Sequence, residues 1–104
     1  MAVEISNDET YSVHLASTEN VVIKYYADWC GICQLFSPKY KKLSTDERFK
    51  HILFLSINSE YNPIVRRIAG LDTLPFFAIF RNGVFVKSVS NTNEEKLIEL
   101  LESL

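Results

Sequence analysis

The sequence predicts one α/β domain in which helices cover both faces of a central mixed β-sheet. Three observations favour this fold class. Short apolar runs rich in β-branched and aromatic residues lack strict alternation, which is typical of strands buried on both faces. Segments with apolar residues near helical spacing separate these runs, and one Asn-Gly turn follows the last long run. The predicted order is β-α-β-α-β-α-β-β-α, with parallel pairing across the helical connections and an antiparallel hairpin strand at the edge.

The first quarter of the chain predicts a short strand, a helix and a long strand. Apolar residues alternate over residues 3–5, which indicates a short edge strand. Ser6-x-x-Glu9 is the pattern of a helix start, so we expect a helix over about residues 8–17. The run Val21–Ala27 then predicts a strand covered on both faces.

The middle of the chain predicts two helices around a second buried strand. Apolar residues recur near 3.6 spacing over residues 32–43, and Pro38 inside this pattern predicts a kink. The run His51–Ile57 predicts the strand. Asn62-Pro63 has the residue types of an N-cap and a first helical position, and Gly70 is a suitable stop for that helix.

The last third predicts a β-hairpin and a final helix. Phe76–Phe80 reads as a strand, and Asn82-Gly83 turns the chain into a second strand over Val84–Val86. An amphipathic pattern follows, with Asn91-Thr92 as its predicted cap and acidic residues in its first turn.

Length and composition agree with a single domain over residues 1–104. Hydrophobic residues make up 47% of the chain and charged residues 23%, both ordinary for a globular protein. The net charge of −2 gives no electrostatic reason to expect nucleic acid or an anionic membrane as a partner. No apolar run approaches the roughly 20 residues of a membrane span. Because the opening residues carry acidic side chains and no basic segment, we expect a cytoplasmic protein.

The two cysteines of the chain, Cys30 and Cys33, form a C-x-x-C pair. Such a pair alone is a weak signal, because it also occurs as half of a zinc site. A zinc site needs two further ligands, and the only histidines, His14 and His51, fall in unrelated predicted elements. We therefore expect no metal within one chain, and the pair is either catalytic or incidental in a reducing compartment.

The position of the pair favours redox chemistry. It lies where a buried strand ends and a helix begins, so that Cys30 falls at the helix N-terminus. Free backbone N–H groups and the positive end of the helix dipole favour a thiolate there. We therefore assign Cys30 as the nucleophile and Cys33, one turn later, as the more enclosed residue that resolves a mixed disulfide. Trp29 is predicted to give an apolar surface over the site, with core packing as the simpler alternative.

The sequence resembles the thioredoxin family over nearly its whole length. The resemblance rests on Ala27-Asp-Trp-Cys-Gly-Ile-Cys33, on the proline five residues after Cys33, on Thr73-Leu-Pro75 and on Asn82-Gly83. It implies the thioredoxin fold, with Trp29, Gly31 and Ile32 completing the site around the cysteines.

The resemblance also implies a substrate groove. Pro75 would be a cis proline that faces the cysteine pair, and Leu74 would lend its backbone to an extended substrate strand. Thr73 and Asn91 would complete this groove. Asn91 stands in a loop where the family usually has a glycine, and asparagine tolerates positive φ better than most residues.

Three positions depart from the family pattern. Ile32 replaces the usual proline of Cys-Gly-Pro-Cys, which frees a backbone N–H and predicts a less reducing couple. Lys24 stands where the family carries a buried acid, and Ser56 is expected opposite it. We expect Lys24 and Asp28 to modulate the cysteine pKa values. Lys24 would either stabilise the Cys33 thiolate or have its own pKa lowered by burial, and the simpler alternative is that its head merely extends to water.

The sequence thus predicts a thiol–disulfide oxidoreductase that reduces or exchanges protein disulfides through Cys30 and Cys33. The resemblance implies no bound cofactor, and NADPH would act only indirectly, through a thioredoxin reductase or a glutathione-type electron donor. A more oxidising exchange protein is a variant of this hypothesis. Two alternatives are a non-catalytic binding module that docks a partner around Trp29 and Pro75, and a metal or iron–sulfur site shared by two copies. We expect a monomer.

Overall fold

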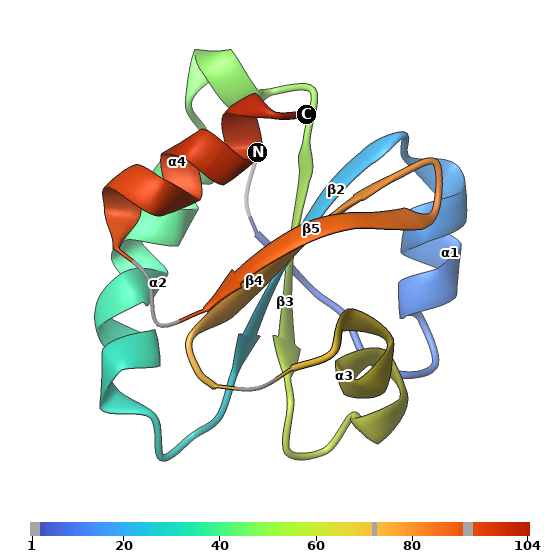
Figure 1. Cartoon of the computed structure of the whole chain (residues 1–104), viewed down its shortest axis with the longest axis vertical. Coiled ribbons are helices and arrows are strands. Elements are labelled where there is room, and N and C mark those ends of the chain that lie inside the picture. Colours follow the sequence, from blue (N-terminus) through green and yellow to red (C-terminus); the bar gives the residue numbers. More distant parts are fainter. Residues whose placement is uncertain (1–2, 72, 91–92) are drawn as a thin grey trace.

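The computed structural model describes residues 3–71, 73–90 and 93–104. Its elements follow the predicted order, with one additional 3-10 turn, η1 (Figure 1). In chain order they are β1 (Glu4–Ile5), α1 (Tyr11–Ser17), β2 (Asn20–Tyr26), α2 (Gly31–Ser44), η1 (Glu47–Phe49), β3 (Leu53–Asn58), α3 (Pro63–Ala69), β4 (Phe76–Arg81), β5 (Val84–Ser90) and α4 (Glu94–Glu102). No helix among the described residues is both long and apolar enough to cross a bilayer.

The five strands form one mixed sheet in the order β1-β3-β2-β4-β5. Strands β1 and β2 both pair with β3 in parallel, whereas β4 pairs antiparallel with β2 and with β5. The expectation of parallel pairing across helical connections is therefore confirmed for the first three strands and wrong for β4.

The chain enters β4 at the end of the sheet where β3 finishes, with Phe76 opposite Tyr25, and runs back antiparallel. Helix length alone does not set this direction. Helix α3, before β4, has seven residues, but so has α1, which connects β1 and β2, and these two strands both run parallel to β3.

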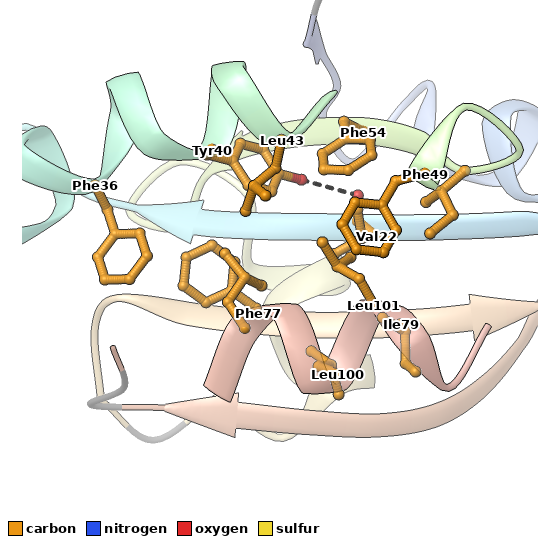
Figure 2. Close-up of a cluster of buried hydrophobic side chains, with 12 residues drawn as sticks. Val22, Phe36, Tyr40, Leu43, Phe49, Phe54, Phe77, Ile79, Leu100 and Leu101 are labelled. Carbon is orange, nitrogen blue, oxygen red and sulfur yellow. Dashed lines mark hydrogen bonds between the residues drawn. The ribbon is translucent and has the colours of Figure 1, made fainter. Parts of the chain in front are cut away.

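Two buried clusters lie on opposite faces of the sheet, because successive residues of β2 point to opposite faces. Val21, Ile23 and Tyr25 join the cluster that also holds residues of α1 and α3. Val22 joins the cluster under α2 and α4 (Figures 1 and 2). Within it, the Tyr40 hydroxyl lies 3.1 Å from the Val22 carbonyl and 2.7 Å from that of Leu55, so α2 is tied to two neighbouring strands.

The N-terminal segment differs from the prediction. Helix α1 begins at Tyr11 with Thr10 as N-cap, and the Ser6-x-x-Glu9 capping box does not form. The Asn7 side chain instead accepts hydrogen bonds from the backbone N–H groups of Glu9 and Thr10, which makes a turn that delays the helix. Ser6 is buried and bonded to Thr10 and His14.

Helix α3 is capped from a distant part of the chain. Asn62 is its N-cap by position, as predicted, but its side chain makes no capping hydrogen bond. The Asp8 carboxylate accepts from the N–H groups of Ile64 (3.2 Å) and Val65 (2.9 Å) instead. The Asn62 amide oxygen in turn accepts from the Asp8 N–H at 2.8 Å.

Two local predictions are confirmed. Gly70 ends α3 in the left-handed conformation, with φ of 68°. Asn82 and Gly83 both have positive φ, as a type I′ hairpin turn requires. Helix α2 continues through Pro38, and the kink at this residue stays a prediction. The predicted cap at Asn91-Thr92 lies outside the described residues, and the Asn93 side chain accepts from the Lys96 N–H to cap α4.

Candidate active site

The cysteine pair occupies the junction between β2 and α2, as predicted. Cys30 is the N-cap of α2, and its Sγ accepts a hydrogen bond from the Cys33 N–H at 3.2 Å. The two residues form a disulfide, with 5.3 Å between their Cα atoms. Cys33 is 1% exposed and Cys30 is 6% exposed. Cys33 is thus the more enclosed of the two, and the helix N-terminus stabilises a Cys30 thiolate once the pair is reduced.

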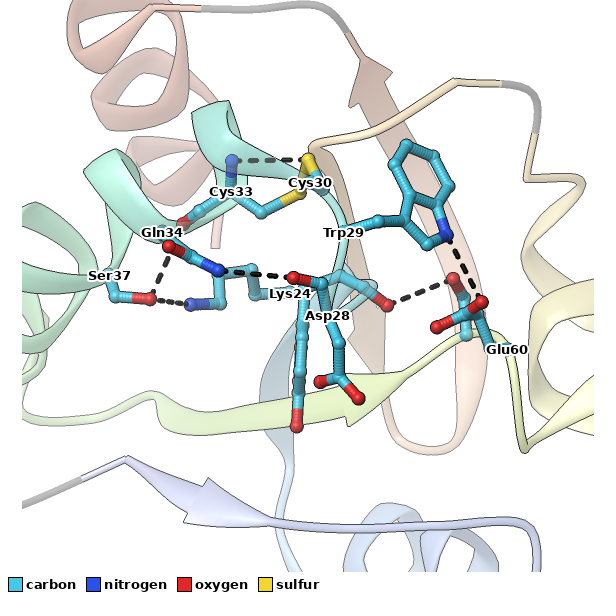
Figure 3. The surroundings of a disulfide bond; sticks show 10 residues. Lys24, Asp28, Trp29, Cys30, Cys33, Gln34, Ser37 and Glu60 are labelled. Atoms are coloured by element: carbon cyan, nitrogen blue, oxygen red, sulfur yellow. Dashed lines mark hydrogen bonds between the residues drawn. A yellow bond between two sulfur atoms is a disulfide. The ribbon is translucent and has the colours of Figure 1, made fainter.

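Trp29 lies on the surface beside the disulfide. Its side chain is 71% exposed, so core packing is wrong as an explanation of this tryptophan. The indole Nε1 donates a hydrogen bond to Oε2 of Glu60 at 3.1 Å (Figure 3). This bond holds the ring toward the loop between β3 and α3 and keeps an apolar surface next to the cysteines.

Gly31 and Ile32, between the two cysteines, are exposed at the start of α2. A Cβ atom added at Gly31 would meet nothing within 4 Å, so no steric contact requires glycine there. The influence of Ile32 on the redox potential stays a prediction.

The Leu74–Pro75 peptide bond is cis, as the resemblance implied. Leu74 packs against the small buried cluster formed by Ala27, Cys30 and Cys33, which brings this loop to the disulfide. Thr73 is exposed. Asn91 lies outside the described residues. The role of this groove in substrate binding stays a prediction.

Lys24 lies behind the disulfide, on the face of β2 that α2 covers. It is 5% exposed and stands opposite Ser56 of β3, as expected, and opposite Phe77 of β4. Its Nζ donates a hydrogen bond to Ser37 Oγ at 2.7 Å, so the head is held within the protein and does not extend freely to water. Burial lowers the pKa of Lys24 below its ordinary value.

A pocket of about 300 Å³ connects this lysine with the disulfide. Its walls include Lys24, Cys33, Ser37 and Asp28. The Asp28 carboxylate is exposed and accepts from the side-chain amide of Asn58 at 3.3 Å. Asp28 and Lys24 therefore border one pocket next to the resolving cysteine.

Sequence reasoning missed two residues of the site. Ser37 lies four residues after Cys33, which places both on one face of a helix, and its hydroxyl donates to the Cys33 carbonyl at 3.3 Å. The spacing of Cys33 and Ser37 could therefore have identified Ser37 from the sequence. Glu60 comes from the loop after β3, far from Trp29 in sequence, and no local pattern pointed to it.

The two histidines contact residues other than the cysteine pair. His14 contacts Ser6 and Glu4, and His51 contacts the Leu104 carbonyl. No three His, Cys, Asp or Glu residues come together as a metal-binding group in the described ranges. The chemistry that the site offers is the exchange between a dithiol and a disulfide.

These features define a class of site: a dithiol–disulfide centre at the N-terminus of a helix, with the leucine of a cis Leu-Pro bond packed beside it, in a mixed-sheet α/β fold. Residues 2–103 match the family model described as Thioredoxin, and the chain belongs to the thioredoxin family.

Individual relatives agree with this assignment. The chain is 30% identical to the chloroplast thioredoxin F-type of Brassica napus over 103 residues, 96% of this chain and 55% of the relative. It is also 30% identical to thioredoxin of Ictalurus punctatus, covering 93% of this chain and 92% of that one. The chain spans about half the length of the chloroplast relatives that it matches.

A solved structure shows the same fold. Thioredoxin f2, in a crystal structure of the complex of ferredoxin:thioredoxin reductase and thioredoxin f2, superposes with a TM-score of 0.88. The two chains are 28% identical, and the match covers 98% of this chain and 94% of that one.

Proposed function

We propose that the chain is a thiol–disulfide oxidoreductase that reduces or exchanges disulfides of protein substrates through Cys30 and Cys33. The observation that carries the proposal is the Cys30–Cys33 disulfide at the N-terminus of α2, with Leu74 packed against it. A pair in this position alternates between two stable states, because the helix start favours the thiolate when the disulfide opens.

The reaction proceeds in two exchanges. The Cys30 thiolate attacks one sulfur of the substrate disulfide, that S–S bond breaks, and the other substrate sulfur leaves as a thiolate. The Cys33 thiolate then attacks Cys30 Sγ, and the second substrate sulfur leaves as a thiolate. Two electrons pass to the substrate, the Cys30–Cys33 disulfide forms, and the protons of the two cysteine thiols end on the substrate sulfurs.

The electron donor belongs to the same proposal. The similar thioredoxin f2 forms a complex with ferredoxin:thioredoxin reductase, which supports a reductase as the partner that recharges this chain. A glutathione-type donor is the alternative, and NADPH would act only through such a partner. We propose no bound cofactor.

We also propose that the protein works as a monomer in the cytoplasm. The two cysteines of the chain are both used in the active pair, which suits a reducing compartment. Gel filtration and cell fractionation test these two statements separately from the activity.

Insulin reduction by dithiothreitol, with and without the protein, tests the activity. The wild-type protein should accelerate the reduction, and Cys30→Ser should abolish the acceleration. Cys33→Ser should trap a mixed disulfide that mass spectrometry detects, because Cys30 still attacks but nothing resolves the adduct. A wild-type protein without activity and without a reversible couple in a redox titration would contradict the proposal and favour the binding module.

A further inference from the structure

The structure contains a buried cation that the reaction described above does not use. Lys24 extends from β2 beneath α2 and lines the pocket of about 300 Å³ that Cys33 also lines. The side chain is 5% exposed. Burial of a charged ammonium group costs free energy unless its charge stabilises a nearby group.

The contacts of the ammonium group hold it in place but do not neutralise it. Nζ donates to Ser37 Oγ at 2.7 Å, and Ser37 Oγ donates to the Cys33 carbonyl at 3.3 Å (Figure 3). The ring centroids of Tyr26 and Tyr40 lie 5.5 Å and 5.4 Å from Nζ, at the range of a cation–π contact. Among the ion pairs of the described residues none involves Lys24.

Among the groups around Lys24, Cys33 is the acid whose ionised form is best placed to interact with the ammonium charge. Helix α2 contributes Cys33 and Tyr40, and burial raises the pKa of Tyr40, which therefore stays neutral. Tyr26 and Asp28 come from β2 and the loop after it; the Asp28 carboxylate is exposed and bonded to Asn58. Ile5, Ser56 and Phe77, on β1, β3 and β4, carry no charge.

Resting on the proposed function, we propose that Lys24 is a positioning residue whose ammonium group stabilises the thiolate of Cys33 in the resolving step. Ser37 holds the ammonium group against the first turns of α2 that carry Cys33. The cation thus acts within the pocket that Lys24 and Cys33 both line.

The resolving step shows where the charge matters. Cys33 loses its thiol proton to solvent, and its thiolate attacks Cys30 Sγ of the mixed disulfide. The bond between Cys30 and the substrate sulfur breaks, and the substrate leaves as a thiolate that takes up a proton. Negative charge therefore resides on Cys33 just before the attack, and a fixed cation in the same pocket favours that state.

The pH dependence of resolution tests the inference. Cys30 is loaded with a thionitrobenzoate group at low pH, and release of the coloured thiolate is followed by stopped flow after jumps to higher pH. Lys24→Met should move the midpoint of the profile to higher pH. At neutral pH the rate should fall about threefold, because a roughly tenfold smaller thiolate fraction is partly offset by a more nucleophilic thiolate.

Two control variants separate charge at this site from charge in general. Lys24→Arg keeps the cation in the pocket and should retain the wild-type profile. Lys39→Met removes the same charge from an exposed position on α2, where Nζ lies 5.6 Å from the Phe36 ring, and should change little. A Lys24→Met profile that superposes on that of the wild type, or on that of Lys39→Met, overturns the inference.

A second measurement needs no substitution at Lys24. By reciprocity, a Cys33 thiolate must raise the pKa of Lys24 as much as the ammonium group lowers that of Cys33. NMR titration of the Lys24 side chain should therefore give a higher pKa in the dithiol form than in the disulfide form. Equal values in the two forms overturn the inference, even if Lys24→Met fails to fold.

The failure of this inference is distinguishable from failure of the proposed function. If the wild-type protein does not reduce insulin, the proposed function fails. The thiolate absorbance of Cys33 in Cys30→Ser, with and without Lys24→Met, still decides whether the ammonium group stabilises Cys33, because that titration needs no substrate.

Discussion

The indole Nε1 of Trp29 lies 3.1 Å from Oε2 of Glu60, so a residue of the loop after β3 restrains the aromatic ring beside the cysteines. The ring is largely exposed, so packing restrains it little. The hydrogen bond to a carboxylate therefore restrains its orientation, because hydrogen bonds to charged groups are the stronger ones.

Removal of that carboxylate should release the indole. In Glu60→Ala we expect lower anisotropy of the fluorescence and easier quenching by acrylamide, and Trp29 is the only tryptophan of the chain, so the signal is unambiguous. Glu60→Gln keeps an acceptor oxygen and should resemble the wild type. Identical anisotropy in all three proteins would mean that the bond does not restrain the ring.

Asp8 should stabilise the fold through α3. Asp8→Ala removes the acceptor of two N–H groups in the first turn of that helix, which should lower the free energy of unfolding in urea by about 1 kcal/mol. Asp8→Asn retains an acceptor and should lose less. Glu9→Ala changes an exposed neighbouring acid and serves as the control; equal effects of Asp8→Ala and Glu9→Ala would contradict the assignment.

Ile32 should make the couple less reducing than a proline would. The Ile32 N–H lies in the first turn of α2, where it strengthens the field that favours a Cys30 thiolate, and proline removes it. Ile32→Pro should therefore lower the reduction potential by about 30 mV, the equivalent of roughly 1.4 kcal/mol for two electrons. Ile32→Val keeps the N–H and should not change the potential. A potential of Ile32→Pro at or above that of the wild type would refute this expectation.

Lys24 should lower the free energy of unfolding at neutral pH. In the disulfide form, Lys24→Met should raise the free energy of unfolding by about 1 kcal/mol, because it removes a buried cation that lacks an ion-pair partner among the described residues. The folded-state pKa of Lys24 is lowered, so the unfolded chain binds more protons between that pKa and 10.5. The free energy of unfolding of the wild type therefore increases relative to that of the variant as pH rises through this window.

Urea unfolding at several pH values checks this sign. The difference between the two proteins should be largest at neutral pH and should shrink toward pH 10.5. Tyr25 and Tyr40, whose pKa values burial raises, are present in both proteins, so their titration cancels in the difference. A difference that grows with pH would contradict the lowered pKa.

Local patterns predicted much of the fold. The strand β2, the helix start at Cys30 and the stop at Gly70 follow from residue type and spacing, which act over a few neighbouring residues. The direction of β4 did not follow from helix length. Seven-residue helices precede both β2, which runs parallel to β3, and β4, which runs antiparallel to β2.

Contacts between distant segments explain what the sequence did not predict at the site. The Ser6-x-x-Glu9 pattern predicted a local cap, but Asp8 instead caps α3, more than fifty residues away. Trp29 is held by Glu60 from another loop, and no periodicity reports such a pair. Each of these bonds depends on how the loops at the ends of the strands are brought together.

The sequence by itself determined the order of strands and helices, the placement of Cys30 and Cys33 where a strand meets a helix, and the likeness to one family, since these depend on residue type and local spacing. Only the tertiary structure decided that the Lys24 head is enclosed, that Ser37 holds it, and that Leu74 reaches the disulfide. The physical reason is that burial and hydrogen-bond partners belong to the packed sheet and helices together, and no single segment carries them.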